Sequence, residues 1–347
     1  MIAADTLGSI GESATLARIF PRLPAASSAL LGPGDDAAVV SAPDGRFVVT
    51  TDMMIHGPDF RLAWSTATDL GWKAAASNLA DVAAMGAVPS ALVVAIAAPI
   101  NTPVALLEGI ADGLREGCAA LAPGCGVVGG DLSVSNTLTL AVTAFGDLEG
   151  RAPVLRSGAR PGDVVAVAGI LGKASAGLKL LFAEGVVHGE PDAAAAAEVK
   201  RKHPELTSAQ LAPAPPIAAG RLAALAGATA MLDLSDGLAL DARRIAVASD
   251  VVIDLNSALV GSREALDGGE DHSLLAAFPA GVSLPEGFRA IGTVVGAAPA
   301  ATAATAATDS EVVTAATPRT ARLLVDGQPY DALGGWDPYS GWNGEVG

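Results

Sequence analysis

Acidic residues beside glycine or threonine recur along this chain, and their type and spacing suit metal-assisted chemistry. Nine acids lie at predicted strand ends, in glycine-rich turns or on a predicted helix stripe: Asp35, Asp36, Asp52, Asp81, Asp131, Asp233, Asp236, Glu270 and Asp271. Carboxylate oxygens are hard ligands that suit Mg²⁺ or Ca²⁺, and Mg²⁺ usually completes its shell with waters and substrate phosphates. Clustered carboxylates repel one another unless they are well solvated or bridged by cations. The pattern therefore favours a site for metal-assisted phosphoryl transfer.

Other kinds of catalytic site have less support in the sequence. The four histidines are scattered, and no Ser–His–Asp arrangement stands out. Cys118 and Cys125 are the only cysteines and form no CxxC pair, so free thiols in a reducing compartment are favoured over a metal site or a disulfide. The sequence from Gly169 to Lys173 lacks the GxxxxGK[ST] spacing of a phosphate-binding loop.

Composition limits the class of protein. The 347 residues are enough for two domains, and 51% apolar with 4% aromatic residues describe a soluble protein built from small side chains. A formal charge of −16 argues against nucleic acid as a partner. The first twenty residues lack a signal-peptide pattern, and apolar runs such as 91–100 are too short to span a bilayer. We expect a cytoplasmic protein that binds neither nucleic acid nor membrane.

Two elements are expected to position the first acids. The runs 37–40 and 47–51 flank a Pro-Asp-Gly turn and predict an antiparallel hairpin, in which Asp36 lies roughly opposite Asp52. Residues 65–85 predict a helix that opens with a Thr-x-x-Asp capping box.

Two polar residues, Asn78 and Asp81, lie on the apolar stripe of this helix, where burying them unpaired would be costly. They could form a local hydrogen-bond network, or Asp81 could point at the acids of the hairpin. The sequence leaves both open.

The remaining pattern alternates strands and helices. Strands at 91–98 and 138–145, with a helix at 103–121, complete an α/β unit that ends near residue 150. A further strand within it ends at Gly129-Gly-Asp131, and glycines at such a place let the backbone approach a ligand.

A second α/β unit follows this one. It is predicted to contain a strand at 164–170, a helix at 174–184, a strand ending at Asp233 and a helix at 238–248. Ser235 and Asp236 could cap the last of these helices or help to form a phosphate site at its start. Residues 296–318 are an Ala/Thr-rich, low-complexity insertion that we expect to be flexible.

Seven motifs follow one another along nearly the whole chain: Gly34-Asp-Asp-Ala-Ala38, Thr50-Thr-Asp52, Lys73-x4-Asn78-Leu-x-Asp81-x3-Met85-Gly86, Gly129-Gly-Asp131, Arg156-Ser-Gly-Ala-x-Pro-Gly-Asp163, Asp233-Leu-Ser-Asp-Gly237 and Gly268-Gly-Glu-Asp271. They occur in the order seen in thiamine-monophosphate kinases, and the chain resembles that family over nearly its whole length. The resemblance implies the two-domain α/β (α+β) fold of aminoimidazole-ribonucleotide synthetase and selenophosphate synthetase. Residues 1–150 would bind ATP and Mg²⁺ and dimerise through their strands, and residues 151–347 would form the C-terminal α/β domain.

The resemblance also implies an activity, which is phosphorylation of thiamine monophosphate by ATP, by direct in-line transfer with several Mg²⁺ ions in a homodimer. The implied metal ligands are Asp36, Thr50, Thr51, Asp52, Asp81, Asp131, Asp233 and Asp236. The implied ATP contacts are Gly130, Asp131, Arg156 and Ser235, and the implied substrate contacts are Asp59, Glu270 and Trp336. Arg156, Asp52 and Asp131 would be catalytic, with Arg156 stabilising charge on the transferred group.

The chain departs from the common pattern of the family in four places. They are Leu132-Ser133, His272-Ser273, Arg115 and Pro338. These differences concern nucleotide and substrate contacts more than the metal ligands. Two other functions stay open: an ATP-dependent synthetase that activates an amide or formyl oxygen, and a regulator that binds nucleotide or metal without turnover.

Overall fold

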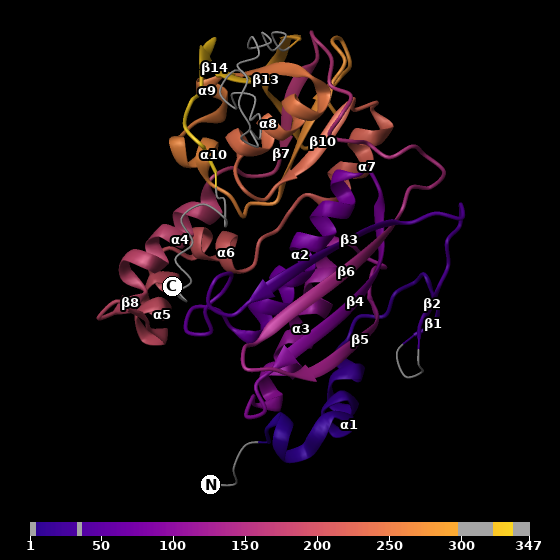
Figure 1. Cartoon of the computed structure of the whole chain (residues 1–347), viewed down its shortest axis with the longest axis vertical. Helices are drawn as coiled ribbons and strands as arrows, with labels where there is room; N and C mark the ends of the chain where they lie inside the picture. Colours follow the sequence, from indigo (N-terminus) through magenta and orange to yellow (C-terminus); the bar gives the residue numbers. More distant parts are fainter. Residues whose placement is uncertain (1–4, 33–36, 298–321, 336–347) are drawn as a thin grey trace, which may run out of the picture.

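The computed structural model describes residues 5–32, 37–297 and 322–335, and within them two β-sheets follow one another along the molecule's long axis (Figure 1). One sheet has four strands and comes from residues 48–147, and the other has seven strands and comes from residues 164–329. Helices pack on both sheets, so the predicted mixed α/β fold class is confirmed. No helix within these ranges is both long and apolar enough to cross a membrane.

The four-stranded sheet has one face covered by two helices. Its strands, in spatial order, are β3 (Val48–Ile55), β6 (Thr139–Asp147), β4 (Val88–Ala98) and β5 (Val127–Val134). Only β4 and β5 run parallel. The covering helices are α2 (Ala67–Ala84) and α3 (Val104–Leu121). They approach so closely that a Cβ on Gly71 would lie 2.0 Å from the carbonyl oxygen of Ile110, which explains the glycine.

A short N-terminal segment packs beside α3 and the edge of this sheet. It contains α1 (Leu7–Ile19), the 3₁₀ helix η1 (Phe20–Arg22), β1 (Ala29–Leu31) and β2 (Val39–Val40). Helix α1 is kinked at Gly11, whose φ is 76°.

The seven-stranded sheet is mostly antiparallel and is covered on both faces. Its spatial order is β10 (Ala230–Leu234), β12 (Ser273–Phe278), β7 (Val164–Ala168), β13 (Phe288–Ala297), β11 (Val251–Leu255), β14 (Leu323–Val325) and β15 (Gln328–Pro329). The helices of this part are α4 (Lys173–Glu184), α5 (Ala193–Lys202), α6 (Pro204–Leu211), α7 (Ile217–Leu225), α8 (Leu238–Ser249), α9 (Ser257–Val260) and α10 (Arg263–Asp267), and a small pair of strands is formed by β8 (Val186–Val187) and β9 (Glu190–Pro191). Alternate residues of β7 face opposite cores: Ala166 and Ala168 pack toward α2 and α7, and Val165 and Val167 pack toward α8.

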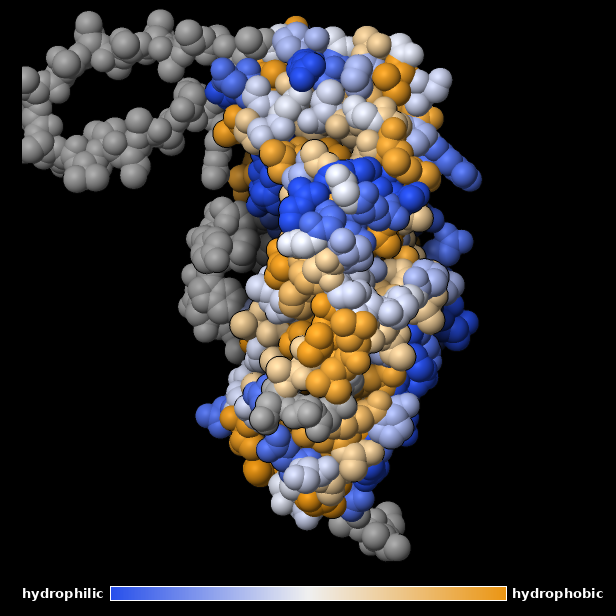
Figure 2. Space-filling view, turned by 90° about the vertical axis from the view of Figure 1, so that its right-hand side faces the viewer, coloured by the Kyte–Doolittle hydropathy of each residue, from blue (hydrophilic) through white to orange (hydrophobic). Residues whose placement is uncertain are grey.

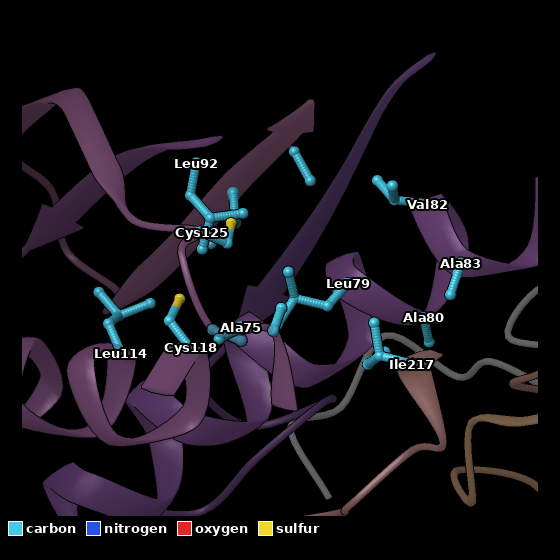
Figure 3. Packing of buried hydrophobic residues seen from close by; sticks show 14 of the residues in the cluster. Ala75, Leu79, Ala80, Val82, Ala83, Leu92, Leu114, Cys118, Cys125 and Ile217 are labelled. Carbon is cyan, nitrogen blue, oxygen red and sulfur yellow. The ribbon is translucent and has the colours of Figure 1, made fainter. Parts of the chain in front are cut away.

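Helix α2 is the element that joins the two parts of the molecule. Its small buried side chains contact the four-stranded sheet on one side and α7 on the other. Figure 3 shows Leu79 and Ala80 of α2 beside Ile217 of α7. Cys118 and Cys125 lie in the same core as buried free thiols, in agreement with the sequence prediction.

The predicted hairpin is wrong. The turn forms, with Gly45 N–H donating to the Ala42 carbonyl at 3.0 Å, but β2 pairs with β1 and β3 pairs with β6. All eight residues of β3 find partners on β6, whereas β2 contains only two residues, so the longer pairing satisfies more backbone groups. Asp52 therefore lies opposite Val142, and Asp36 lies outside the described residues.

Two other local predictions need correction. Strand β5 continues through Gly130 and Asp131 to Val134, so Asp131 lies inside a strand and not at its end. Helix α8 has Gly237 at its N-cap with no side-chain cap, so neither Ser235 nor Asp236 caps it. The Asp241 carboxylate instead accepts from the backbone N–H groups of Asp236 and Gly237, at 3.2 and 3.1 Å.

The helices predicted from capping and periodicity are confirmed. Helix α2 begins after Thr66 with the predicted capping box to Asp69, and α3, α4 and α8 lie where the pattern placed them. The chain passes from one sheet to the other between β6 and β7, and the division into domains 1–150 and 151–347 stays a prediction. The Ala/Thr-rich insertion falls almost wholly outside the described residues.

Candidate active site where α2 meets both sheets

Strand β3 and helix α2 present polar groups to each other. Thr50 and Asp52 are two residues apart on β3 and therefore point to the same face, toward α2. The Thr50 hydroxyl donates to Asp81 Oδ2 at 2.7 Å, and the Asp52 backbone N–H donates to Asn78 Oδ1 at 3.1 Å. The sequence left open whether these polar residues form a local hydrogen-bond network or face the acids, and both occur. Asn78 bonds to the backbone of β3 and of its own helix, and Asp81 faces Thr50 and the acids.

Strand β10 brings a further acid to this place from the seven-stranded sheet. The buried Asp233 carboxylate lies 3.2 Å from Nδ1 of buried His272. Burial, together with the charges of Asp233 and Asp52, raises the pKa of Asp81 to about 7. Burial also raises the pKa of Asp52, with His272 opposing it and Asp233 adding to it. The structure therefore gathers three carboxylates from three separate elements.

These carboxylates fit Mg²⁺ better as partial ligands than as a complete cage. Among residues 5–32, 37–297 and 322–335, no three His, Cys, Asp or Glu side chains are grouped closely enough to hold a metal ion by themselves. The donors are all oxygens, and the raised pKa values show negative charge that a cation would stabilise. Mg²⁺ commonly takes one or two carboxylates and fills its shell with water and phosphate oxygens. Asp36, another predicted ligand, is outside the described residues.

Thr51 is turned away from the cluster. Its side chain is on the opposite face of β3, where its Oγ1 donates to the Val142 carbonyl at 2.9 Å and Thr143 Oγ1 lies 3.2 Å away. The side chains of Thr51 and Asp52 therefore lie on opposite faces of the sheet.

Asp131 is also apart from the cluster within this chain. It is in register with Ala95, Ala141 and Met53, so it shares the Met53 face and not the Asp52 face. β5 and β3 are the two edge strands, about 14 Å apart at the usual strand spacing. The Asp131 carboxylate accepts from the Ser133 hydroxyl at 2.7 Å.

The glycine before Asp131 has a structural reason to be there. A Cβ on Gly130 would lie 1.9 Å from the Val94 carbonyl oxygen, whereas a Cβ on Gly129 would meet nothing within 4 Å. Gly130 thus permits close approach of the neighbouring strand, so its glycine does not by itself indicate a ligand.

An apolar pocket opens beside Gly130 and Asp131. Its walls come from α1, α3, β4, β5 and the segment around β2, with side chains that include Leu16, Ile110 and Leu114. Both predicted ATP residues of β5 line it. Arg115 does not line the pocket and instead pairs with Asp112 at 2.5 Å. The pocket could hold an apolar, flat group such as a nucleotide base.

Arg156 and the Ser235–Asp236 pair lie at opposite ends of α8. The Arg156 carbonyl accepts from the Ser249 hydroxyl at the end of this helix, and Ser235 precedes its start. A helix of 12 residues is about 18 Å long. Asp236 pairs with Arg244 at 2.5 Å, and the Ser235 carbonyl accepts from the Glu270 backbone at 2.8 Å. Arg156 is exposed and is not brought to the acid cluster.

Two of the predicted substrate residues lie near each other. Asp59 Oδ2 accepts from the Ile55 N–H at 2.7 Å, and burial raises the pKa of Asp59, with the charges of Glu270 and Lys73 also acting on it. The Glu270 carboxylate forms an ion pair with Lys73 of α2. Trp336 lies outside the described residues.

Several residues of this region were not predicted. Lys73 is one helix turn before Ser77 and two turns before Asp81, and that i, i+4, i+8 spacing could have identified it from the sequence. His272 carries no such signal, because its contact with Asp233 comes from strand pairing between β10 and β12. Asp271, counted among the acids, binds the start of α4 by accepting from the backbone of Gly172 and Ala174.

The sequence of this chain is similar to a known family and to curated kinases. Residues 34–148 match the family "AIR synthase related protein, N-terminal domain". A thiamine-monophosphate kinase of Mycobacterium tuberculosis (strain ATCC 25618 / H37Rv) is 42% identical, over 97% of this chain and 94% of its own. The thiamine-monophosphate kinase of Corynebacterium glutamicum is 39% identical, over 83% of this chain and 87% of its own.

Solved structures show the same similarity. Thiamine monophosphate kinase from Aquifex aeolicus superposes with a TM-score of 0.67 at 27% identity, covering 86% of this chain and 92% of that one. A structure described as AaThiL complexed with AMPPCP and TMP gives a TM-score of 0.66 at 28% identity, covering 87% and 90%. The hydrogenase maturation protein HypE, at 20% identity and a TM-score of 0.61 over 81% of this chain and 88% of that one, shares the fold.

Proposed function

Since the chain belongs to the thiamine-monophosphate kinase family, we propose that it transfers the γ-phosphoryl group of ATP to thiamine monophosphate, giving thiamine diphosphate and ADP. A relative of the same fold holds AMPPCP and TMP together, which supports a site for both substrates in this chain. We place the reaction in the cytoplasm, where two free thiols are kept reduced.

The observation that carries the proposal is the meeting of Asp52, Asp81 and Asp233. Burial and the charge of Asp233 raise the pKa values of Asp52 and Asp81, and acids in such a setting suit a reaction whose substrates bring Mg²⁺ and phosphate groups. We propose that these residues and Thr50 hold several Mg²⁺ ions, which would neutralise phosphate charge during an in-line transfer. Thr50 orients the Asp81 carboxylate, and Asn78 holds the Asp52 backbone.

The apolar pocket beside Gly130 is our proposed place for the adenine ring. The ring would lie among the side chains of α1, α3 and β5, and Asp131 would stand at the polar end of the pocket. Ser235 and Arg156 keep their predicted ATP roles as proposals.

We propose a homodimer formed through the uncovered face of the four-stranded sheet. Val49 and Met53 of this face are 56% and 59% exposed. On the face drawn in Figure 2, one group of hydrophobic residues lies in the lower half, which holds this sheet. Thr51 and Asp131 share the uncovered face, so a second copy could bring its Asp131 to the Thr51 of the first. The two predicted metal ligands that lie apart within one chain would then contribute across the interface.

The test is an assay of thiamine diphosphate and ADP formation by the purified chain with ATP and thiamine monophosphate. We expect one ADP for each thiamine diphosphate, and no product when EDTA replaces Mg²⁺. Asp52→Asn and Asp81→Asn should lower kcat by about 100-fold or more, since each removes a charge that faces the transferred group. Asp250→Asn, an exposed acid paired with Arg322, is the matched control.

Three outcomes would contradict the proposal. A folded chain that makes no thiamine diphosphate would end it. ADP release only with an amide or formyl substrate would favour the synthetase function, and tight ATP binding without ADP release would favour a regulator.

A further inference from the structure

Lys73 is a buried cation on α2, the helix that also carries Asp81 of the proposed site. It is only 7% exposed, and its ammonium group is paired with the Glu270 carboxylate. Burying an ammonium group is unfavourable unless charged and polar partners compensate it. A lysine is therefore kept at this position at a cost in free energy, and the pair crosses from the helix of one sheet to a loop of the other.

The surroundings of Lys73 hold the ammonium group in place. With its amide turned so that both ends are satisfied, buried Gln210 of α6 accepts from Lys73 Nζ at 3.1 Å and donates to the Ala174 carbonyl at 3.0 Å. Thus a carboxylate and an amide oxygen face one ammonium group from different elements. An isolated surface ion pair has a single partner and full solvent access, whereas this ammonium group is buried and has two partners.

The loop that carries Glu270 is held in a strained form. Glu270 and His272 have φ values of 70° and 50°, which non-glycine residues rarely adopt. Hydrogen bonds fix both residues: the Glu270 N–H donates to the Ser235 carbonyl at 2.8 Å and the His272 N–H to the Leu234 carbonyl at 3.0 Å. Local strain of this kind gathers at functional sites, where the surrounding structure maintains it.

The row from Lys73 to Asp81 has opposite charges at its two ends. Lys73, Ser77 and Asp81 lie on one face of α2, and the eight-residue separation corresponds to about 12 Å along the helix axis. Asp59 and Glu270 lie near the cationic end and acids that suit Mg²⁺ lie at the other. A molecule bound along this row would meet a lysine before it reached the metal-binding acids.

Thiamine monophosphate carries a cationic thiazolium ring and an anionic phosphate group, so it needs partners of both signs. Asp59 and Glu270 suit the ring, and a row of acids by itself would repel the phosphate. We propose that Lys73 binds the phosphate group of thiamine monophosphate, exchanging its contact with Glu270 for the phosphate and leaving Glu270 to face the ring. This inference rests on the proposed function and adds a residue to its substrate site.

The test compares two ligands that differ only in the phosphate group. Dissociation constants of thiamine monophosphate and of thiamine are measured by calorimetry on the full chain with Mg²⁺ and AMPPCP. In Lys73→Gln, we expect affinity for thiamine monophosphate to fall about 10- to 100-fold, the range of a charge-assisted hydrogen bond, while affinity for thiamine changes less than about 2-fold. Lys73→Arg should keep most of the preference for the phosphorylated ligand. Lys179→Met, an exposed lysine of α4 paired with Glu264, is the matched control.

A second variant guards against misfolding, because Lys73→Gln leaves the Glu270 charge without its partner. Lys73→Gln/Glu270→Gln removes both charges and keeps a neutral hydrogen-bonding pair. Removing Glu270 alone reduces repulsion of a phosphate, so a loss of preference for thiamine monophosphate in the double variant points to Lys73.

Two results would separate this inference from the proposed function. Equal weakening of both ligands, or an unchanged ratio of their dissociation constants, would overturn the role of Lys73 while leaving the kinase activity in place. A wild-type chain that neither binds nor phosphorylates thiamine monophosphate would overturn the proposed function as well.

Discussion

The hydroxyl of Thr50 donates a 2.7 Å hydrogen bond to the carboxylate of Asp81 and so joins edge strand β3 to helix α2. The bond holds one acid of the site in a fixed orientation, yet it leaves that acid in an unfavourable electrostatic setting. Burial and the charges of Asp233 and Asp52 all raise the pKa of Asp81, and the hydrogen bond from Thr50 and the charge of His272 oppose them. The site is therefore ordered before its substrates bind and is destabilised by its own charge.

The first prediction concerns the pH dependence of stability without metal. The pKa of Asp81 is raised from 3.8 to about 7, so between these values the folded state binds more protons than the unfolded state. Stability must then fall as pH rises through this window, by on the order of 4 kcal/mol, and level off above it. We expect the melting temperature in EDTA to fall between pH 5 and pH 8, and Mg²⁺ to restore it most at the higher pH.

Asp81→Asn tests the assignment of this effect. The variant should show a shallower fall with pH and a smaller response to Mg²⁺. Some slope should remain, because burial likewise raises the pKa of Asp241 to about 7. A variant with the slope of the parent chain would show that Asp81 is not the group responsible.

The second prediction concerns the link between α2 and the backbone of β3. Asn78 is 1% exposed and accepts from the Asp52 N–H, which points away from the sheet because β3 is an edge strand. Asn78→Ala leaves that N–H without its partner and should lower the free energy of unfolding by about 1–3 kcal/mol. Ser77→Ala, which loses only a hydrogen bond to its own helix, should cost much less. Chemical denaturation of the three proteins checks this, and equal losses in both variants would contradict it.

The elements that could be predicted from the sequence are those specified locally. The capping box of Thr66 and Asp69 predicts the start of helix α2, and the spacing of its apolar residues predicts its length. The turn at Gly45 is likewise present. The partner of β3 could not be predicted in this way, because alternation within a strand indicates which residues share a face but not which distant strand supplies the hydrogen bonds. That partner, β6, begins more than eighty residues later.

The same limit explains the outcome for the site. Asp52, Asp81 and Asp233 come together as the motif order indicated, whereas the helical stripe alone left the direction of Asp81 open. The separation of Asp131 from them follows from the register of β4, β5 and β6, which no single-sequence pattern contains. The helical spacing of Lys73, Ser77 and Asp81 places the lysine on the same face as the acid, so its position could be predicted from the sequence.

The third prediction separates two adjacent glycines of β5. A Cβ at Gly130 would lie 1.9 Å from the Val94 carbonyl oxygen, while a Cβ at Gly129 would enter open space. Gly130→Ala should therefore force β4 and β5 apart and cost about 2–4 kcal/mol, whereas Gly129→Ala should stay within about 0.5 kcal/mol of the parent. Melting temperatures without ligand test this before any effect on ATP binding is considered. Similar stabilities for the two variants would contradict the geometry.

The last prediction concerns the segment that leads to the C-terminus. Arg243, on α8, donates to the backbone carbonyls of Tyr330, Ala332 and Leu333, and its guanidinium group lies 5.6 Å from the centre of the Tyr330 ring. A planar guanidinium can serve several carbonyls at once, and a lysine ammonium cannot reproduce that geometry.

Arg243→Lys should therefore loosen residues 330–334, lower the free energy of unfolding by about 2–4 kcal/mol and speed proteolytic removal of the C-terminal end. Mass spectrometry of timed digests measures the removal. Arg201→Lys, an exposed arginine paired with Glu198 on α5, is the control and should digest like the parent. Because the predicted substrate contact Trp336 follows this segment in the sequence, the KM for thiamine monophosphate should rise in Arg243→Lys more than the KM for ATP. Equal digestion of the two variants would mean that α8 does not hold this segment through Arg243.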